Sequence, residues 1–276
     1  MKDRTLEYYT ADDFSSVEKI DMHVHLNSCT TGVIGLGETL RYKVVLIDTD
    51  VPEFPSVDEQ HRVACTMRQR HPGRLEHLTA FSLQGWDSKD WTDRTIEKLK
   101  SDFLDGASGV KVWKNIGMVV KNEAGQYIMI DDPKFDPVMD FIIQEDKTVL
   151  GHLGEPKNCW LPLEEMTVNN DRDYFRNHPE YHMFLHPEYP SYDDQINARD
   201  RFLERHPSLR FIGAHLASLE WSVDELAKRL DRFPNLAVDL AERLSQLQVQ
   251  SQADREKVRQ FFIKYQDRII DRKSVV

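Results

Sequence analysis

The chain contains little cysteine and no long apolar run. Its 276 residues include three cysteines, Cys29, Cys65 and Cys159, and none of them belongs to a Cys-x-x-Cys pair. An odd, scattered set of this kind argues against a disulfide framework and for a reducing compartment. The first residues form no apolar signal-peptide core, and no run reaches the ~20 residues that a membrane-spanning helix needs. We therefore predict a cytoplasmic location and no membrane partner.

Positive charge is also scarce. The sequence has 36 Lys and Arg against 47 Asp and Glu, which gives a net charge of −11. This balance argues against nucleic acid or an anionic membrane as the main partner. It does not exclude an anionic small molecule, because a bound metal can dominate the local field. A small-molecule substrate is the expected partner, and assembly into a homo-oligomer stays open.

The motifs of several enzyme classes are missing as well. The sequence contains no Gly-x-x-x-x-Gly-Lys phosphate loop, no Gly-x-Ser-x-Gly nucleophile turn and no zinc-ribbon spacing.

What the chain does contain is a regular alternation of short apolar runs and amphipathic stretches. Near-continuous Val, Ile and Leu is typical of parallel strands that are buried on both faces. Strands that alternate with helices predict a parallel sheet with the helices outside, and a (β/α)8 TIM barrel fits a chain of about 250 residues. We therefore predict an α/β fold, a TIM barrel that is incomplete at strand eight. The expected strands are 19–26, 43–48, 75–83, 109–113, 148–153, 210–216, 236–240 and 268–270, and the expected helices are 56–70, 93–104, 134–145, 192–205, 222–233 and 252–265.

The first strand ends in Asp-Met-His-Val-His-Leu, which places His23 and His25 two residues apart. Side chains two apart on a strand project from the same face. Two imidazoles on one face are half of a metal site, because neutral imidazole suits zinc and related ions. The alternative for an isolated pair is two hydrogen-bonded core histidines. Asp21 lies on the same face and is either an orienting partner or a solvated acid.

Single histidines recur at the ends of two later strands. His152 ends the fifth predicted strand and His215 ends the sixth. Either one alone would more often be a satisfied core residue. Unrelated core histidines would not be expected to share the strand-end position of His23 and His25, so the set predicts a metal site at the carboxyl ends of the strands.

Two further strand positions carry charge. Lys111 lies in the fourth predicted strand, where a charged lysine is costly unless it is paired, neutralised or modified. A neutral lysine could act as a base or be carbamylated to bridge two metals, while the alternative is a lysine whose tip reaches solvent. Asp239, near the end of the seventh strand, either supports a ligand or pairs with Arg243.

Long loops follow the fourth and fifth strands, at 114–130 and 154–189, and such loops form the catalytic face of a barrel. Glu155, Trp160 and Arg199 are the candidate substrate contacts, with Arg199 gripping a carboxylate in bidentate fashion. His182 and His186 are more simply surface loop residues.

Taken in order, four segments resemble the amidohydrolase superfamily, and within it the amidohydrolase-related (amidohydrolase 2) branch. They are Asp-Met-His-Val-His, Gly-Val-Lys-Val-Trp-Lys-Asn, Gly-His-Leu-Gly-Glu-Pro and Gly-Ala-His-Leu-Ala-Ser, and the resemblance runs over residues 19–270. It implies that His23, His25 and His152 bind a divalent metal, with Zn²⁺ expected as one or two ions. His215 would be a further ligand in a binuclear site or a catalytic residue in a mononuclear one. Lys111 matches the position that some branches carbamylate.

The sequence departs from this family at its end. The family carries an aspartate after strand eight, in a context like Gly-Thr-Asp, and no such segment follows Ile270. We expect residues 1–270 to form a hydrolase domain that lacks most of strand eight and helix eight. Residues 271–276 would be a non-native tail, because a common sequencing adapter encodes the same hexapeptide in one frame; the alternative is a naturally short homologue.

These observations predict a metal-dependent hydrolase that acts on a small amide, lactone or ester through a metal-activated water, with His215 and Lys111 as its catalytic residues. One alternative is a metal-dependent non-oxidative decarboxylase of an unsaturated or aromatic acid, a reaction that the same branch contains. The other is a non-catalytic truncated fragment.

Overall fold

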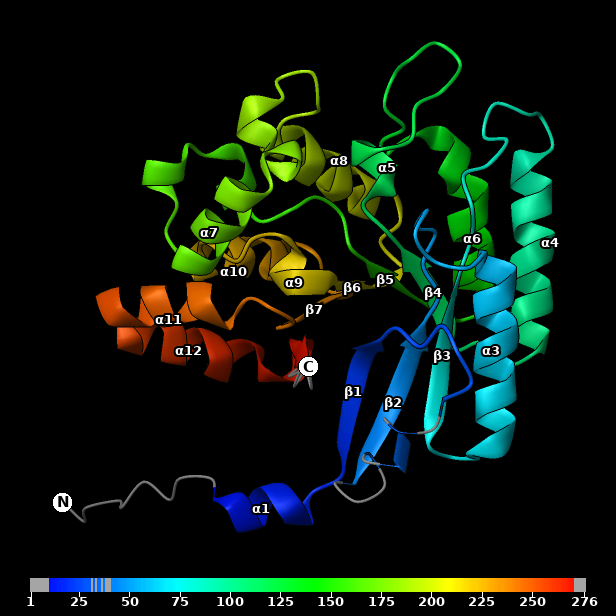
Figure 1. Cartoon of the computed structure of the whole chain (residues 1–276), viewed down its shortest axis with the longest axis horizontal. Helices are drawn as coiled ribbons and strands as arrows, with labels where there is room; N and C mark the ends of the chain where they lie inside the picture. The colour runs from blue at the N-terminus through cyan, green and yellow to red at the C-terminus, as the bar shows by residue number, and fades with distance from the viewer. Residues whose placement is uncertain (1–9, 31, 33, 36, 38–40, 271–276) are drawn as a thin grey trace.

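The protein is built around eight parallel strands that form a nearly closed barrel with helices around it (Figure 1). The structure, a computed structural model, describes residues 10–30, 32, 34–35, 37 and 41–270. The strands follow one another around the sheet in chain order. They are β1 Lys19–Val24, β2 Tyr42–Ile47, β3 Leu75–Ala80, β4 Gly109–Val112, β5 Thr148–Gly151, β6 Arg210–Gly213, β7 Leu236–Asp239 and β8 Ile269–Ile270.

The predicted TIM-barrel fold is confirmed, and each predicted strand is present. β8 has two residues and pairs with β7 through Val238 and Asp239. Between β8 and β1, no strand pairing is found in the part of the chain that the structure describes. The proposed non-native tail, 271–276, lies outside the described residues.

The helices form where the amphipathic stretches predicted them, and they cover the outside of the sheet. Two helix starts are capped by serine: Ser56 accepts a hydrogen bond from the backbone of Glu59, and Ser222 accepts one from Glu225. Figure 1 shows α3, α4 and α6 along one side of the barrel. The predicted helices correspond to α3 Val57–Arg70, α4 Trp91–Leu104, α6 Asp136–Gln144, α8 Tyr192–Arg205 and α10 Val223–Arg232.

The last predicted helix, 252–265, is wrong in its start. The chain instead forms two helices, α11 Leu244–Ala253 and α12 Arg255–Tyr265, which meet at Asp254. Asp254 is extended and caps α12 by accepting from the backbone of Lys257 at 3.0 Å. α11 was missed because its serines and glutamines give it little amphipathic pattern. Further α-helices of the described chain include α1 Ala11–Ser16, α5 Asn115–Met118, α7 Asn169–Asn177 and α9 Ala214–Ala217.

Apolar side chains fill the barrel below the mouth. Val45, Ile47, Leu78 and Leu150 pack together inside it with Ala214. Alternate residues of the same strands point outward to the helices, since successive side chains on a strand face opposite ways. None of the helices in the described ranges is both long and apolar enough to cross a membrane.

Gly151 gives β5 and β6 room to pack just before His152. A Cβ atom added there would lie 2.1 Å from Cζ of Phe211, which is buried. We expect Gly151→Ala to lower the free energy of unfolding by about 1–3 kcal/mol, measured by urea denaturation, because the ring or the strand must move. Gly32→Ala is the control, since an added Cβ there meets no atom within 4 Å. Equal stability of the two variants would contradict the close packing.

Candidate metal centre

Four histidines predicted from strand ends lie together at the mouth of the barrel. The ring centroids are 5.3 Å apart for His23 and His25, 5.4 Å for His23 and His215, and 4.3 Å for His152 and His215. His23 lies in β1 and His25 directly follows it, His152 follows β5, and His215 lies in the turn after β6. His23 and His215 are buried, whereas His25 is exposed. The cluster therefore opens to solvent on the side of His25.

Three of these rings are held through Nδ1. His215 Nδ1 lies 2.9 Å from the carbonyl oxygen of Ala241, and His25 Nδ1 lies 3.2 Å from that of Ile47. His23 Nδ1 lies 3.4 Å from Oδ2 of Asp239. A carbonyl oxygen only accepts, so Nδ1 carries the proton in His215 and His25, and Nε2 keeps its lone pair. This is the arrangement by which outer carboxylates and carbonyls orient metal-binding histidines.

His152 supplies a fourth nitrogen by a different route. Its backbone N–H donates to the carbonyl of Val112 at 2.9 Å, and its Nε2 is buried with no hydrogen-bond partner among the described residues. Burial, with the nearby His215 and Lys111, holds the pKa of His152 well below its usual range. Burial and Arg243 likewise lower the pKa of His215. Both rings are therefore neutral at pH 7 and able to donate a lone pair.

His215 begins an unusual backbone turn. Four successive residues, His215 to Ser218, have φ between 55° and 58°, the left-handed region. Each residue other than glycine in this region costs roughly 1–2 kcal/mol of conformational free energy. The turn therefore persists only because contacts with the rest of the protein hold it.

The surroundings of this turn hold it at several points. The backbone N–H of His215 donates to Oδ1 of Asp239 at 2.7 Å. The Ser218 hydroxyl donates to the carbonyl of Leu153 at 3.0 Å, and the Tyr192 hydroxyl donates to the carbonyl of Ser218 at 2.5 Å. The strained turn thus fixes the His215 ring over the barrel mouth.

Asp239, at the end of β7, supports the cluster. Its Oδ1 accepts the backbone N–H of His215 and, at 3.1 Å, that of Ala241, while its Oδ2 faces His23. Burial alone would raise the pKa of Asp239, but the hydrogen bonds from His23 and from the backbone N–H of His215 act against it, and the pKa lies well below the usual range. The carboxylate is thus ionised. Of the two predicted roles, support of a ligand fits these contacts.

Lys111 faces the cluster rather than solvent. It is 2 % exposed, and its Nζ lies 3.4 Å from Nε2 of His23. The contact links β4 to β1 across the barrel mouth. The alternative reading, a buried stem with its tip in solvent, does not fit this burial.

Two of the three predicted substrate contacts lie in the segment after β5. Glu155 forms an ion pair with Lys114, and both are half-buried. Trp160 is half-buried, with its Nε1 donating to the carbonyl of Pro190 at 3.3 Å and its ring edge-on to Tyr192. Their roles toward a substrate stay predictions.

The structure corrects the expectation for Arg199. This side chain is 1 % exposed on α8. Its Nη2 and Nε donate to Oδ1 of Asp200 at 2.8 and 3.2 Å, and its Nη1 donates to the carbonyl of Ala217. These contacts occupy the guanidinium and tie α8 to the left-handed turn. With three of its N–H donors held and 1 % of the residue exposed, Arg199 is placed to position the turn rather than to meet a substrate carboxylate.

We expect Arg199→Ala to lower the free energy of unfolding by about 3 kcal/mol, because it leaves buried polar partners unpaired. Arg201→Ala is the matched control, since Arg201 is exposed and its ion pair with Asp131 should contribute less than about 1 kcal/mol. Urea denaturation measures both. Unchanged stability of Arg199→Ala, with a raised KM for carboxylate substrates alone, would return Arg199 to substrate binding.

The residues present fit a divalent metal. Four imidazoles lie side by side with ring centroids 4.3–5.4 Å apart, three of them oriented through Nδ1 and one with a buried, unpartnered Nε2, and an ionised carboxylate stands behind them. Neutral imidazole backed by carboxylate or carbonyl acceptors is the donor set that suits Zn²⁺ and related ions.

No family model and no curated protein matches the chain. Solved structures do match it. The 2,6-dihydroxybenzoate decarboxylase from Rhizobium is 14% identical over 92% of this chain and 86% of its own, with a TM-score of 0.55. A 2,6-dihydroxybenzoate decarboxylase complexed with 2,6-dihydroxybenzoate is also 14% identical, over 93% of this chain and 86% of its own, with a TM-score of 0.56. The 4-oxalomesaconate hydratase from Rhodopseudomonas palustris is 9% identical over 89% of this chain and 66% of its own, with a TM-score of 0.50. At these identities the likeness shows a shared fold.

Proposed function

We propose that the chain is a metal-dependent hydrolase of the amidohydrolase superfamily, acting on a small amide, lactone or ester. The observation that carries this proposal is the convergence of His23, His25, His152 and His215 at the barrel mouth, backed by Asp239. Catalytic residues of TIM-barrel enzymes lie at this face. The ordered motifs of the superfamily in the sequence, and a fold shared with 2,6-dihydroxybenzoate decarboxylase, support the assignment.

In this proposal His23, His25 and His152 hold the metal, with Zn²⁺ expected, and His215 stands beside them. A bound divalent ion of this kind lowers the pKa of water and polarises a carbonyl oxygen. The Nδ1–H of His215, donated to the carbonyl of Ala241, leaves Nε2 as an acceptor. This tautomer supports a ligand role for His215 over a hydrogen-bond donor role toward the substrate.

Asp239 is the proposed proton acceptor. Its two oxygens offer about four lone-pair sites. Two backbone N–H groups contact Oδ1, and His23 contacts Oδ2. One site therefore remains on Oδ2, beside the histidine cluster, for a proton from the attacking water.

Lys111 is the proposed bridge to a second ion. If its Nζ is carbamylated, metal content should rise by about one ion per chain when the loading buffer contains bicarbonate, because the carbamate provides oxygen ligands. Elemental analysis with and without bicarbonate measures this rise. Lys111→Gln should abolish it, whereas Lys114→Gln should keep it. If Lys111 is unmodified and the metal content does not change with bicarbonate, Lys111 has a purely structural or basic role instead.

A second candidate function is non-oxidative decarboxylation. The observation in its favour is the fold shared with two decarboxylase structures, at TM-scores of 0.55 and 0.56. The test is a panel of lactones, amides, esters and hydroxybenzoates given to the Zn²⁺- or Mn²⁺-loaded chain, with acid release and carbon dioxide release followed in parallel. Acid release without carbon dioxide supports hydrolysis, and carbon dioxide release supports the second candidate. A metal-loaded, folded chain that does neither would contradict both.

A further inference from the structure

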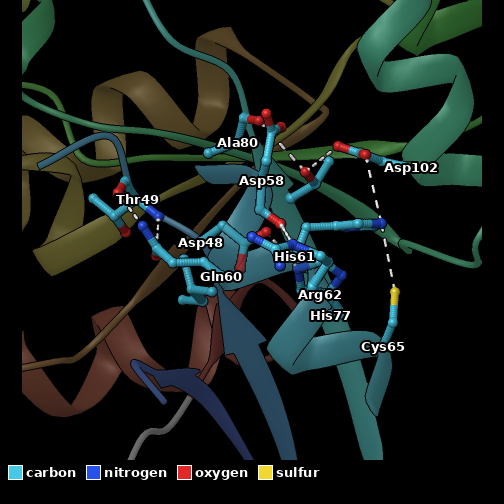
Figure 2. Close-up of polar contacts among 12 residues, drawn as sticks. Asp48, Thr49, Asp58, Gln60, His61, Arg62, Cys65, His77, Ala80 and Asp102 are labelled. Carbon is cyan, nitrogen blue, oxygen red and sulfur yellow. Dashed lines mark hydrogen bonds and ion pairs between the residues drawn. The ribbon is translucent and has the colours of Figure 1, made fainter. Parts of the chain in front are cut away.

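A second cluster of metal-binding side chains lies outside the barrel, between the sheet and α3. Asp48 follows β2, His77 lies in β3 and His61 lies on α3 (Figure 2). Their neighbours Ile47 and Leu78 point into the barrel, so Asp48 and His77 point outward to the helix layer. This cluster is therefore distinct from the four histidines at the barrel mouth.

The three side chains are close and buried. His77 is 0 % exposed, Asp48 2 % and His61 7 %. His77 Nε2 lies 2.7 Å from Oδ2 of Asp48, and the two imidazole centroids are 5.1 Å apart. One possible ligand atom from each residue lies within 4.8 Å of the other two. Small side-chain rotations would bring such atoms to the spacing of a shared ion.

Hydrogen bonding within the protein does not satisfy this cluster. His61 uses Nε2 toward Oδ2 of Asp105 at 3.3 Å, and His77 uses Nε2 toward Asp48. The Nδ1 atoms of both rings are buried without a hydrogen-bond partner among the described residues. Two unsatisfied nitrogens side by side in one core are uncommon, because each buried polar atom left unpaired costs about 1–3 kcal/mol.

The pattern around His61 is one that metal sites use. A ligating histidine almost always donates its other ring N–H to a carboxylate or carbonyl, which fixes the ring and strengthens the ligand. His61 has Asp105 in that place, with Asp102 at 3.5 Å from the same nitrogen. The charge of Asp102 is met by Lys98 at 2.7 Å. Asp48 has no lysine or arginine at hydrogen-bond distance in the described chain.

We propose that His61, His77 and Asp48 form a second metal site, which takes a borderline divalent ion such as Zn²⁺ and fastens α3 to β2 and β3. Nitrogen and carboxylate oxygen are ligands that Zn²⁺ accepts. Burial raises the pKa of Asp48, and a divalent cation would offset the cost of keeping that carboxylate charged. Cys65, whose Sγ lies 3.4 Å from Nε2 of His61, is the adjacent thiol.

The test counts zinc in chains whose barrel site is removed. The 276-residue His23→Ala, His25→Ala protein is loaded with Zn²⁺ alone, dialysed against a weak chelator and analysed for metal. We expect about one zinc per chain to remain. Adding His61→Gln should bring zinc to background, because an amide cannot replace the imidazole lone pair. Adding His206→Gln should leave it unchanged, since His206 is equally buried and bonded to Asp136 at 3.0 Å but lies in another layer.

A second variant and a second readout guard against misfolding. Asp48→Asn keeps an acceptor for His77 but loses the charge, and it should weaken zinc retention at least tenfold in a chelator competition. Zn²⁺ should also raise the Tm of the doubly substituted chain and of its His206→Gln form, but not of its Asp48→Asn form. No zinc in the doubly substituted chain, zinc retained after His61→Gln, or an unchanged zinc affinity after Asp48→Asn would overturn the second site. These results do not depend on catalysis, so they leave the proposed function untouched.

Discussion

Replacing His23 and His25 together with alanine should abolish turnover, lowering kcat/KM by at least ~10³-fold. A catalytic metal contributes several kcal/mol of transition-state stabilisation, and about 1.4 kcal/mol corresponds to a factor of ten. Removing two ligands removes that contribution. The measurement is the steady-state rate on whichever substrate of the panel is turned over, at saturating Zn²⁺.

The matched control is His186→Ala. This histidine lies in the long segment after β5, with Nε2 2.9 Å from the carbonyl of Pro179, away from the four-histidine cluster. It should keep the full rate and the same metal content. A double variant that retains more than a tenth of the rate would contradict the metal centre, provided that its circular dichroism spectrum matches that of the unsubstituted chain.

The second large effect should come from Asp239→Asn. Loss of a positioned proton acceptor reduces rates by about 10²–10⁴-fold. The amide also changes the contact with His23: if its oxygen keeps the two backbone N–H groups, its NH₂ group faces the Nδ1 of His23. Two donors then oppose each other, and the ring loses its orientation. We expect kcat to fall with a smaller fall in metal affinity, about 10- to 100-fold, as for other outer partners of metal ligands.

The control is Asp136→Asn, which also removes the charge of a carboxylate that is hydrogen-bonded to a histidine, but outside the proposed site. Asp136 accepts from His206 Nε2 at 3.0 Å and from Arg205, in the helix layer. Its replacement should change stability and leave kcat within about twofold. An Asp239→Asn protein with unchanged kcat would move the proton-accepting role to another residue.

The barrel could be predicted from the sequence because its strands are short apolar runs in regular alternation. The strand-end histidines could be predicted for the same reason, since parallel strands bring their carboxyl ends to one face. Once His23, His152 and His215 are placed at strand ends, their convergence follows from the fold.

The details that orient these histidines could not be predicted. The left-handed turn at His215 to Ser218 contains no glycine, so no residue marks it. It is held by tertiary contacts from α8 and β7, including Arg199, whose burial is not visible in the sequence. An arginine near a predicted active-site loop suggests ligand binding, but here the packing of α8 turns it inward.

The second cluster was missed for a related reason. His77 lies in the middle of β3, and Asp48 directly follows β2, so each can be taken as an isolated polar residue in an apolar run. His61 lies on α3, where it and Gln60 are both buried polar residues, so it does not stand out in the helix. Only the packing of α3 onto the sheet places the three together.

The metal content of the purified chain beside that of its His23→Ala, His25→Ala variant tests the central claim most directly. Both proteins are loaded under identical conditions with Zn²⁺, freed of loosely bound ion and analysed by elemental spectrometry against protein concentration. The account predicts that the unsubstituted chain holds at least about one more ion per chain than the variant. Equal metal content in two folded proteins would contradict a metal centre at the barrel mouth.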